Sequence, residues 1–161
     1  MSIKRLQSEY TQITKDPNYF FSVNPNDNNF FHWDIILIGP PDTPFEGAEI
    51  KAQLDFPTSY PIDPPLFKFI TNVFHPNIYV DGKICISILD KKPDEFGYYK
   101  ISDTWSPSRS IESILMSIIS MLSAPNFDSP ANVDASVMWR NNYNEYKKIV
   151  YKMVSNSQKL I

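Results

Sequence analysis

The chain has 161 residues, of which 42% are hydrophobic and 20% are charged, a composition typical of one soluble globular domain spanning residues 1–161. A formal charge of −3 argues against a dedicated nucleic-acid-binding protein, which usually carries a basic excess. One cysteine and two histidines are too few for an internal disulfide or an ordinary structural zinc site, and we expect no metal.

The N-terminal segment predicts an amphipathic helix over residues 1–16. Apolar side chains recur there at steps of three and four residues, which places them on one helical face. The segment contains none of the 14 prolines, which all lie between residues 17 and 130. We expect Lys4, Arg5 and Glu9 on the polar face.

The middle of the chain predicts four antiparallel strands. Residues 49–56 alternate strictly between apolar and polar side chains, the period of a strand with one solvated face. Residues 30–38 are rich in aromatic and β-branched side chains and end at a Gly-Pro-Pro turn signal. Shorter strands are expected at 20–23 and 66–70. The short, turn-rich links between these segments favour an antiparallel meander over parallel βαβ units.

Three further helices are expected after the strands. Residues 108–124 predict a helix that is apolar on nearly all sides, which places it at the centre of the fold. Its serines are spaced either as a functional polar face or as a stripe of small residues that permits close packing, and we favour the stripe. Residues 132–160 have room for two helices. The predicted fold class is α+β, with an N-terminal helix, a four-stranded antiparallel meander, a central helix and C-terminal helices.

The most informative stretch of the chain contains four short motifs. Taken alone, each has an ordinary structural interpretation, such as a rigid proline-rich loop or a small buried cysteine. The motifs are Tyr60-Pro61-Ile62-Asp63-Pro64-Pro65, His75-Pro76-Asn77, Cys85 and Trp105-Ser106-Pro107.

In this order and spacing, the motifs resemble those of the ubiquitin-conjugating enzyme family, over nearly the whole chain. Cys85 follows Asn77 by eight residues, as the resemblance requires, but Trp105 follows Cys85 by 20 residues, a longer gap than most members have. The inserted segment, with Gly97 and Tyr98, is similar to that of the loop-inserted subclass. Without a long acidic C-terminal tail, the chain most resembles the G type, which serves degradation at the endoplasmic reticulum.

The resemblance implies a reaction and a set of partners. Cys85 would accept ubiquitin from the ubiquitin-activating enzyme as a thioester, and a RING-type ligase would promote its transfer to a lysine amine on a substrate protein or on ubiquitin. No cofactor is implied, because the activating enzyme uses the ATP. We expect a cytoplasmic monomer that binds no nucleic acid, does not insert into a membrane, and reaches the endoplasmic reticulum surface through a partner.

The resemblance also assigns roles around the cysteine. Cys85 must react as its thiolate, and Lys83 either favours that thiolate or, as we prefer, is an ordinary solvated lysine. Asn77 either donates its amide to the oxyanion that forms during transfer or braces the loop that shapes the site. His75 and Pro76 are expected to be structural.

The incoming lysine must lose a proton, and we expect no free histidine near the site. Relatives with the inserted loop commonly carry histidine where this chain has Asp90, and a carboxylate can orient or desolvate an amine. Asp90 is therefore our first candidate. The other candidates are Asp94, Glu95, Asp103 and Asp128.

The expected partner surfaces follow from position in the family fold. Lys4 and Arg5 are implied to contact the activating enzyme and the ligases in turn. The ligase-facing loops are implied to be Pro61-Ile62-Asp63 and Ser106-Pro107-Ser108, and a negative charge at Asp63 would restrict the range of ligases by repulsion.

Two alternative functions stay open. One is a catalytically silent ubiquitin- or ligase-binding module of the same fold, and the other is a conjugating enzyme for a ubiquitin-like modifier. A cysteine-histidine hydrolase is disfavoured, because His75 is expected to be used by its turn and no glycine-rich turn surrounds Cys85.

Overall fold

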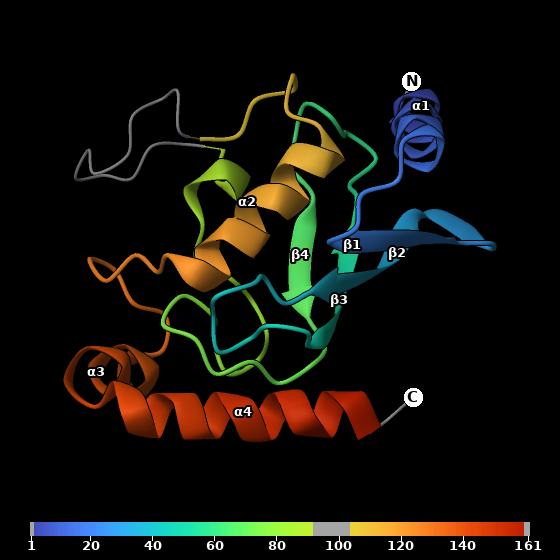
Figure 1. The fold of residues 1–161 in the computed structure, drawn as a ribbon. Coiled ribbons are helices and arrows are strands. Elements are labelled where there is room, and N and C mark those ends of the chain that lie inside the picture. The colour runs from blue at the N-terminus through green and yellow to red at the C-terminus, as the bar shows by residue number, and fades with distance from the viewer. Residues whose placement is uncertain (1, 92–103, 160–161) are drawn as a thin grey trace.

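The computed structural model describes residues 2–91 and 104–159 and has the predicted α+β fold (Figure 1). In these ranges, the strands form one antiparallel sheet in the order β1-β2-β3-β4, which confirms the meander. No helix in the described part of the chain is long and apolar enough to cross a bilayer. The elements are α1 (Ser2–Lys15), β1 (Phe21–Asn26), β2 (Asn29–Ile38), β3 (Glu49–Asp55), β4 (Leu66–Phe69), a 3-10 turn η1 (Ser87–Leu89), α2 (Ile111–Ser123), α3 (Val133–Asn141) and α4 (Tyr143–Lys159).

The alternation in β3 produces a sheet with one buried and one solvated face. Ile50, Ala52 and Leu54 are buried, whereas Lys51 and Asp55, which point to the other face, are exposed. In the register of the sheet, Leu54 pairs with Trp33 of β2, so that large apolar side chains of adjacent strands meet on the same face. This face supplies the core against which the helices pack.

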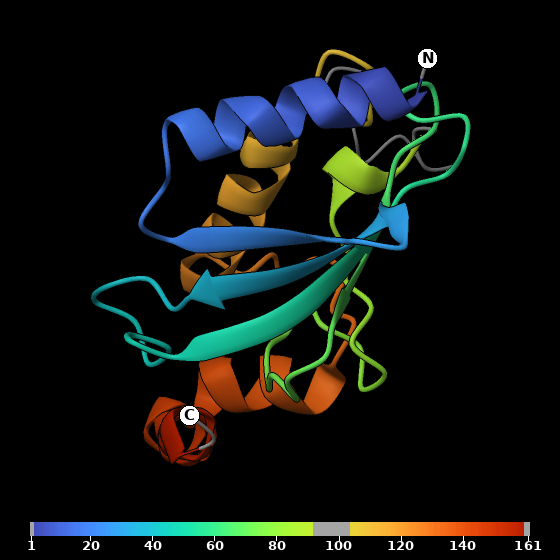
Figure 2. The same ribbon diagram turned by 90° about the vertical axis from the view of Figure 1, so that its right-hand side faces the viewer.

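Helix α2 occupies the centre of the fold, as its apolar sequence predicts. Ile114, Leu115 and Leu122 are fully buried in the core. Figures 1 and 2 show α2 against one face of the sheet, with α1 along the β1 side and α4 beneath β3. The helix therefore holds its C-terminal end and the loop after it in a fixed position relative to the strands.

The start of α2 is capped from two directions. The Ser110 side-chain oxygen accepts the backbone N–H of Ser113 at 3.1 Å, and the Glu9 carboxylate, from α1, accepts the N–H of Ile111 at 2.7 Å. Both contacts satisfy N–H groups that have no partner inside the helix, and a negative charge at a helix N-terminus is favourable. The cap thus joins α1 to α2.

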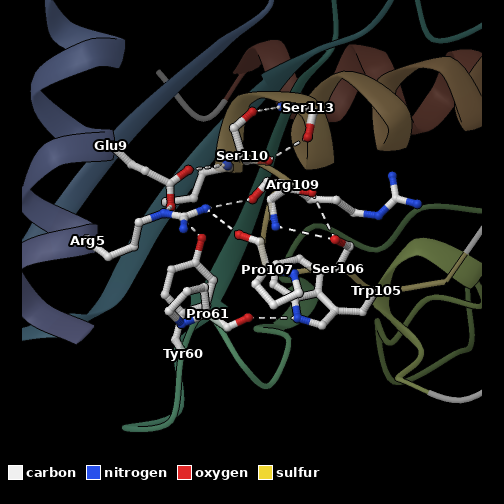
Figure 3. Close-up of polar contacts among 12 residues, drawn as sticks. Arg5, Glu9, Tyr60, Pro61, Trp105, Ser106, Pro107, Arg109, Ser110 and Ser113 are labelled. Carbon is white, nitrogen blue, oxygen red and sulfur yellow. Dashed lines mark hydrogen bonds and ion pairs between the residues drawn. The ribbon is translucent and has the colours of Figure 1, made fainter. Parts of the chain in front are cut away.

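Glu9 is also the centre of a polar cluster that joins α1 to two loops (Figure 3). Its carboxylate accepts hydrogen bonds from the Arg5 guanidinium at 3.2 Å and from the Tyr60 hydroxyl. Burial and the neighbouring Glu9 raise the pKa of Tyr60 far above its ordinary range, so this hydroxyl keeps its proton and donates. The Arg5 guanidinium also donates to the carbonyls of Pro107 and Arg109, at 2.8 and 3.1 Å.

Candidate active site

The His75-Pro76-Asn77 turn connects four parts of the chain. The Asn77 backbone N–H donates to His75 Nδ1 at 3.0 Å, so that Nε2 carries the proton and donates to the carbonyl of Met121, near the end of α2, at 2.8 Å. The Pro76 carbonyl accepts two N–H groups from residues 131 and 132, which precede α3. The histidine is fully buried. Its ring is therefore engaged on both nitrogens and lies inside the protein.

Asn77 is buried, and its side chain forms two hydrogen bonds with one residue far along the chain. Its Oδ1 accepts the backbone N–H of Asn126 at 2.9 Å, and its Nδ2 donates to the backbone carbonyl of the same residue at 2.7 Å. This pair holds the loop after α2 against the turn. The Asn77 amide carries two N–H donors, and the contact with the Asn126 carbonyl uses one of them.

Cys85 lies directly across a short hairpin from Asn77. Residues 78 and 84 pair as an antiparallel bridge, and the Cys85 N–H donates to the Asn77 carbonyl at 2.9 Å. The hairpin turns at Gly82, whose φ of +95° favours glycine, and a side chain there would lie 2.1 Å from the Phe69 carbonyl oxygen. The backbone therefore sets the position of Cys85 relative to Asn77 independently of the thiol.

A cavity of about 260 Å³ opens beside Cys85, which is itself half-buried. Ser117 and Ser120 of α2 line this cavity, so part of the small-residue stripe of that helix lies beside the cysteine. A larger hollow of about 560 Å³ between β3 and α4 shares no residue with this cavity. The cavity beside the cysteine is lined by Asn77, Cys85, Ile86, Ser87, Ser117, Ser120, Met121, Ala124 and Asn126.

Asp90 ends the short turn η1, five residues after Cys85. Its N–H donates to the Ser87 carbonyl at 2.9 Å, and its own carbonyl accepts the N–H of Trp105 at 2.7 Å. The residue is exposed overall, but partial desolvation of its carboxyl group raises the pKa of Asp90 above its ordinary value.

Asp128, another of the candidate carboxylates, is exposed in the loop after α2, where its backbone N–H donates to the Asn126 side chain at 2.9 Å. Lys83 is exposed and lies 3.9 Å from Asp81, the contact expected of a solvated surface lysine. Asp94, Glu95 and Asp103, together with Gly97 and Tyr98, lie outside the described residues.

The two histidines have opposite electrostatic environments. Burial lowers the pKa of His75 from 6.5 to about 4. His32, on the solvated face of β2, has its pKa raised above 6.5 by a hydrogen bond from its Nδ1 to Asp55 at 2.6 Å. Neither ring therefore titrates as an isolated histidine would.

These shifts predict how stability depends on pH. Between pH 6.5 and about 4, the unfolded chain binds a proton at His75 and the folded chain does not, so stability falls with falling pH, by on the order of 3 kcal/mol. The contribution of His32 has the opposite sign, since it is present below pH 6.5 and is lost as pH rises through the raised pKa.

A proton NMR titration of the imidazole signals checks both directions. We expect one midpoint above 6.5 and one near 4, and His32→Gln should remove only the first. If the signal that survives in His32→Gln titrates near 6.5, the buried, neutral state assigned to His75 is wrong.

The predicted partner-binding residues divide into exposed and engaged groups. Lys4 is exposed on α1, and Ile62 is 64% exposed at the tip of its loop. Pro107 and Ser108 are exposed, and Ser106 is half-buried with its hydroxyl 2.9 Å from that of Ser108.

Arg5 and Asp63, in contrast, are each engaged by other residues of the chain. The Arg5 guanidinium donates hydrogen bonds to the Glu9 carboxylate and to the carbonyls of Pro107 and Arg109. Asp63 is paired with Lys91, 2.5 Å away. The repulsion expected from an isolated negative charge at Asp63 is therefore reduced by a neighbouring positive charge.

Sequence reasoning missed three residues that shape this region. Glu9 was placed only on a polar face, although its spacing of four residues from Arg5 is a signal for a helical ion pair. Asn126 and Met121 act through backbone groups, which carry no signal in the sequence.

Comparison with known proteins adds the family context. Residues 5–154 match the family model described as "Ubiquitin-conjugating enzyme". The human protein named ubiquitin-conjugating enzyme E2 G2 is 46% identical over 158 residues, which cover 97% of this chain and 96% of that protein. A Caenorhabditis elegans protein named probable ubiquitin-conjugating enzyme E2 7 is 52% identical over 134 residues, with 83% and 82% covered. The Schizosaccharomyces pombe ubiquitin-conjugating enzyme E2-18 kDa is 44% identical over 155 residues, with 95% and 93% covered.

Proposed function

The chain belongs to the ubiquitin-conjugating enzyme family, with similarity to the G type, and from this premise we propose that it carries ubiquitin as a thioester on Cys85 and transfers it to a lysine amine with a RING-type ligase. Members of the family are transferases of the ubiquitin conjugation pathway. The observation that carries the proposal is the position of the cysteine, which is held by backbone hydrogen bonding opposite Asn77 at the edge of a cavity.

The proposed reaction has two steps at Cys85. In the first, its thiolate attacks the thioester between ubiquitin and the activating enzyme, a new C–S bond forms, and the sulfur of the activating enzyme leaves. In the second, a lysine nitrogen attacks the carbonyl, a C–N bond forms, and the Cys85 thiolate leaves. Each step passes through a tetrahedral oxyanion, for which the second amide hydrogen of Asn77 is the proposed donor.

Asp90 is the proposed acceptor for the proton that the lysine amine loses. Its raised pKa supports this role, because a group that titrates closer to neutral pH accepts a proton more effectively. We expect Asp90→Asn to slow transfer to lysine by about 10²-fold at neutral pH. In the wild type, the transfer rate should rise with pH through the pKa of Asp90, and this rise should be absent from the pH–rate profile of Asp90→Asn.

Rates of transfer from preformed thioester to free lysine, measured from pH 4 to pH 8, check this prediction. Asp128→Asn removes the other candidate carboxylate that the structure describes, exposed in the loop after α2, and is the comparison variant. Equal rates and the same pH dependence in wild type and Asp90→Asn would exclude Asp90 as the proton acceptor.

A charging assay tests the proposed function itself. Purified protein is mixed with activating enzyme, ubiquitin and ATP, and the products are separated on a gel with and without thiol reductant. We expect an ATP-dependent adduct that reductant removes. An adduct formed only with a ubiquitin-like modifier would support the second alternative, and no adduct with any modifier would support the silent binding module.

We propose that residues 1–161 act as a single catalytic domain and as a monomer, in the cytoplasm, with recruitment to the endoplasmic reticulum surface by a partner. Exposed Lys4 supports a contact with the activating enzyme, and exposed Ile62 and Pro107 support a ligase surface on neighbouring loops.

A further inference from the structure

The carboxylate of Asp63 is held by two partners. Lys91 Nζ lies 2.5 Å from its Oδ1, and the Ser59 hydroxyl donates to its Oδ2 at 2.6 Å. The lysine first, and the hydroxyl second, hold the pKa of Asp63 below its ordinary value, so the pair stays ionised near neutral pH. Asp63 is therefore part of a contact between the ligase-facing loop and the residue that directly follows Asp90.

A second contact runs in parallel with the first. The indole N–H of Trp105 donates to the carbonyls of Pro61 and Ile62, at 3.0 and 3.2 Å, and the ring is buried. The backbone N–H of the same tryptophan donates to the Asp90 carbonyl at 2.7 Å. Figure 3 shows the indole pointing at the loop through its nitrogen.

Both contacts begin at the loop of residues 59–63 and end at the backbone around Asp90. One passes through the side chains of Asp63 and Lys91, and the other through both N–H groups of Trp105. Ile62 lies within this doubly attached loop, next to Asp63, and its side chain is 64% exposed. A ligase that binds Ile62 therefore acts on a loop whose neighbouring residues hold the backbone of Asp90.

We propose that Asp63 and Lys91 are positioning residues, which couple ligase binding at Ile62 to the placement of Asp90. The inference rests on the proposed function, because it assumes that Asp90 acts in transfer from Cys85. An exposed ion pair contributes little to stability, so its value here lies in geometry. We expect its loss to lower the ligase-stimulated rate of transfer by about three- to tenfold.

The alternative is that Asp63 only contacts the ligase directly, and the two roles predict different kinetics. Loss of a direct contact raises the ligase concentration needed for half-maximal stimulation. Loss of positioning lowers the maximal rate at saturating ligase. A charge exchange between Asp63 and Lys91 restores the pair, and therefore the maximal rate, only if the two residues act on each other.

The experiment compares Asp63→Lys, Lys91→Asp and the double exchange. A RING ligase that accelerates the wild-type protein is titrated into preformed thioester, and transfer to free lysine is followed. We expect each single variant to have a lower maximal rate and the double variant to recover most of it. Lys148→Asp breaks a similarly exposed ion pair, with Glu145 on α4, and should change nothing. Single variants with unchanged maximal rates, or a double variant without recovery, would overturn the proposal.

Hydrogen exchange on the uncharged protein separates this inference from the proposed function. The Trp105 backbone N–H reports the contact with Asp90 without any chemistry at Cys85. We expect Lys91→Asp to speed its exchange several-fold and the double exchange to restore it. Unchanged exchange in Lys91→Asp would overturn the coupling even in a protein that charges with ubiquitin, whereas failure to charge alone would overturn only the proposed function.

Discussion

Replacing Cys85 by serine should convert the reductant-sensitive ubiquitin adduct into a reductant-resistant one, and replacing it by alanine should abolish the adduct. Cys85 is the only cysteine in the chain, so no other thiol can form the thioester. A serine oxygen at the same position forms an oxygen ester, which thiols do not cleave. Gel electrophoresis with and without reductant, together with intact mass, distinguishes the three proteins.

These variants should leave the fold intact. The backbone N–H of Cys85 forms the hydrogen bond to Asn77, and the side chain is only half-buried. We expect the free energy of unfolding of Cys85→Ser to lie within about 1 kcal/mol of the wild-type value. A ubiquitin adduct on folded Cys85→Ala would show that the acceptor is a different group and would contradict the assignment.

Asn77→Ala should have the second-largest effect, on both catalysis and stability. Loss of an oxyanion donor slows transfer by about 10²–10³-fold. The same change removes two hydrogen bonds to the Asn126 backbone, and a hydrogen bond of this kind contributes about 0.5–1.5 kcal/mol to stability. Denaturant unfolding measures the second effect, and single-turnover transfer at a temperature where both proteins are folded measures the first.

Asn77→Asp separates the two roles further. The aspartate keeps an oxygen that can accept the Asn126 N–H, but it has no amide hydrogen for an oxyanion and places a negative charge beside it. We expect it to be as slow as the alanine variant in transfer. A variant of Asn77 that loses stability but transfers ubiquitin at the wild-type rate when folded would show that the residue is only a brace.

The elements of the fold could be predicted because their signals are local. The alternation in β3 and the continuous apolar surface of α2 each reflect burial of one segment against the rest, which the segment itself encodes. The position of Cys85 opposite Asn77 also depends on nearby sequence. The two residues are eight positions apart, and the chain between them can close a hairpin because it turns at Gly82. Such contacts need only nearby sequence.

The contacts that shape the site are long-range, and the sequence does not encode them locally. Asn77 binds the backbone of Asn126, 49 residues away, and any residue at that position offers the same groups. Lys91 meets Asp63 only because the folded chain brings two loops together. Judged by residue type, Asp63 appeared as an isolated charge, and its pairing in the structure changes the consequence expected for ligase choice.

Transfer of ubiquitin from preformed thioester to lysine is the most direct test of the central claim. Labelled ubiquitin is loaded onto Cys85, charging is stopped by removing ATP, and free lysine is added with and without a RING ligase. We predict that the label leaves the protein and appears on lysine, faster with the ligase and more slowly in Asn77→Ala. Label that stays on the protein, or leaves only as free ubiquitin at a rate that lysine and ligase do not change, would contradict the account.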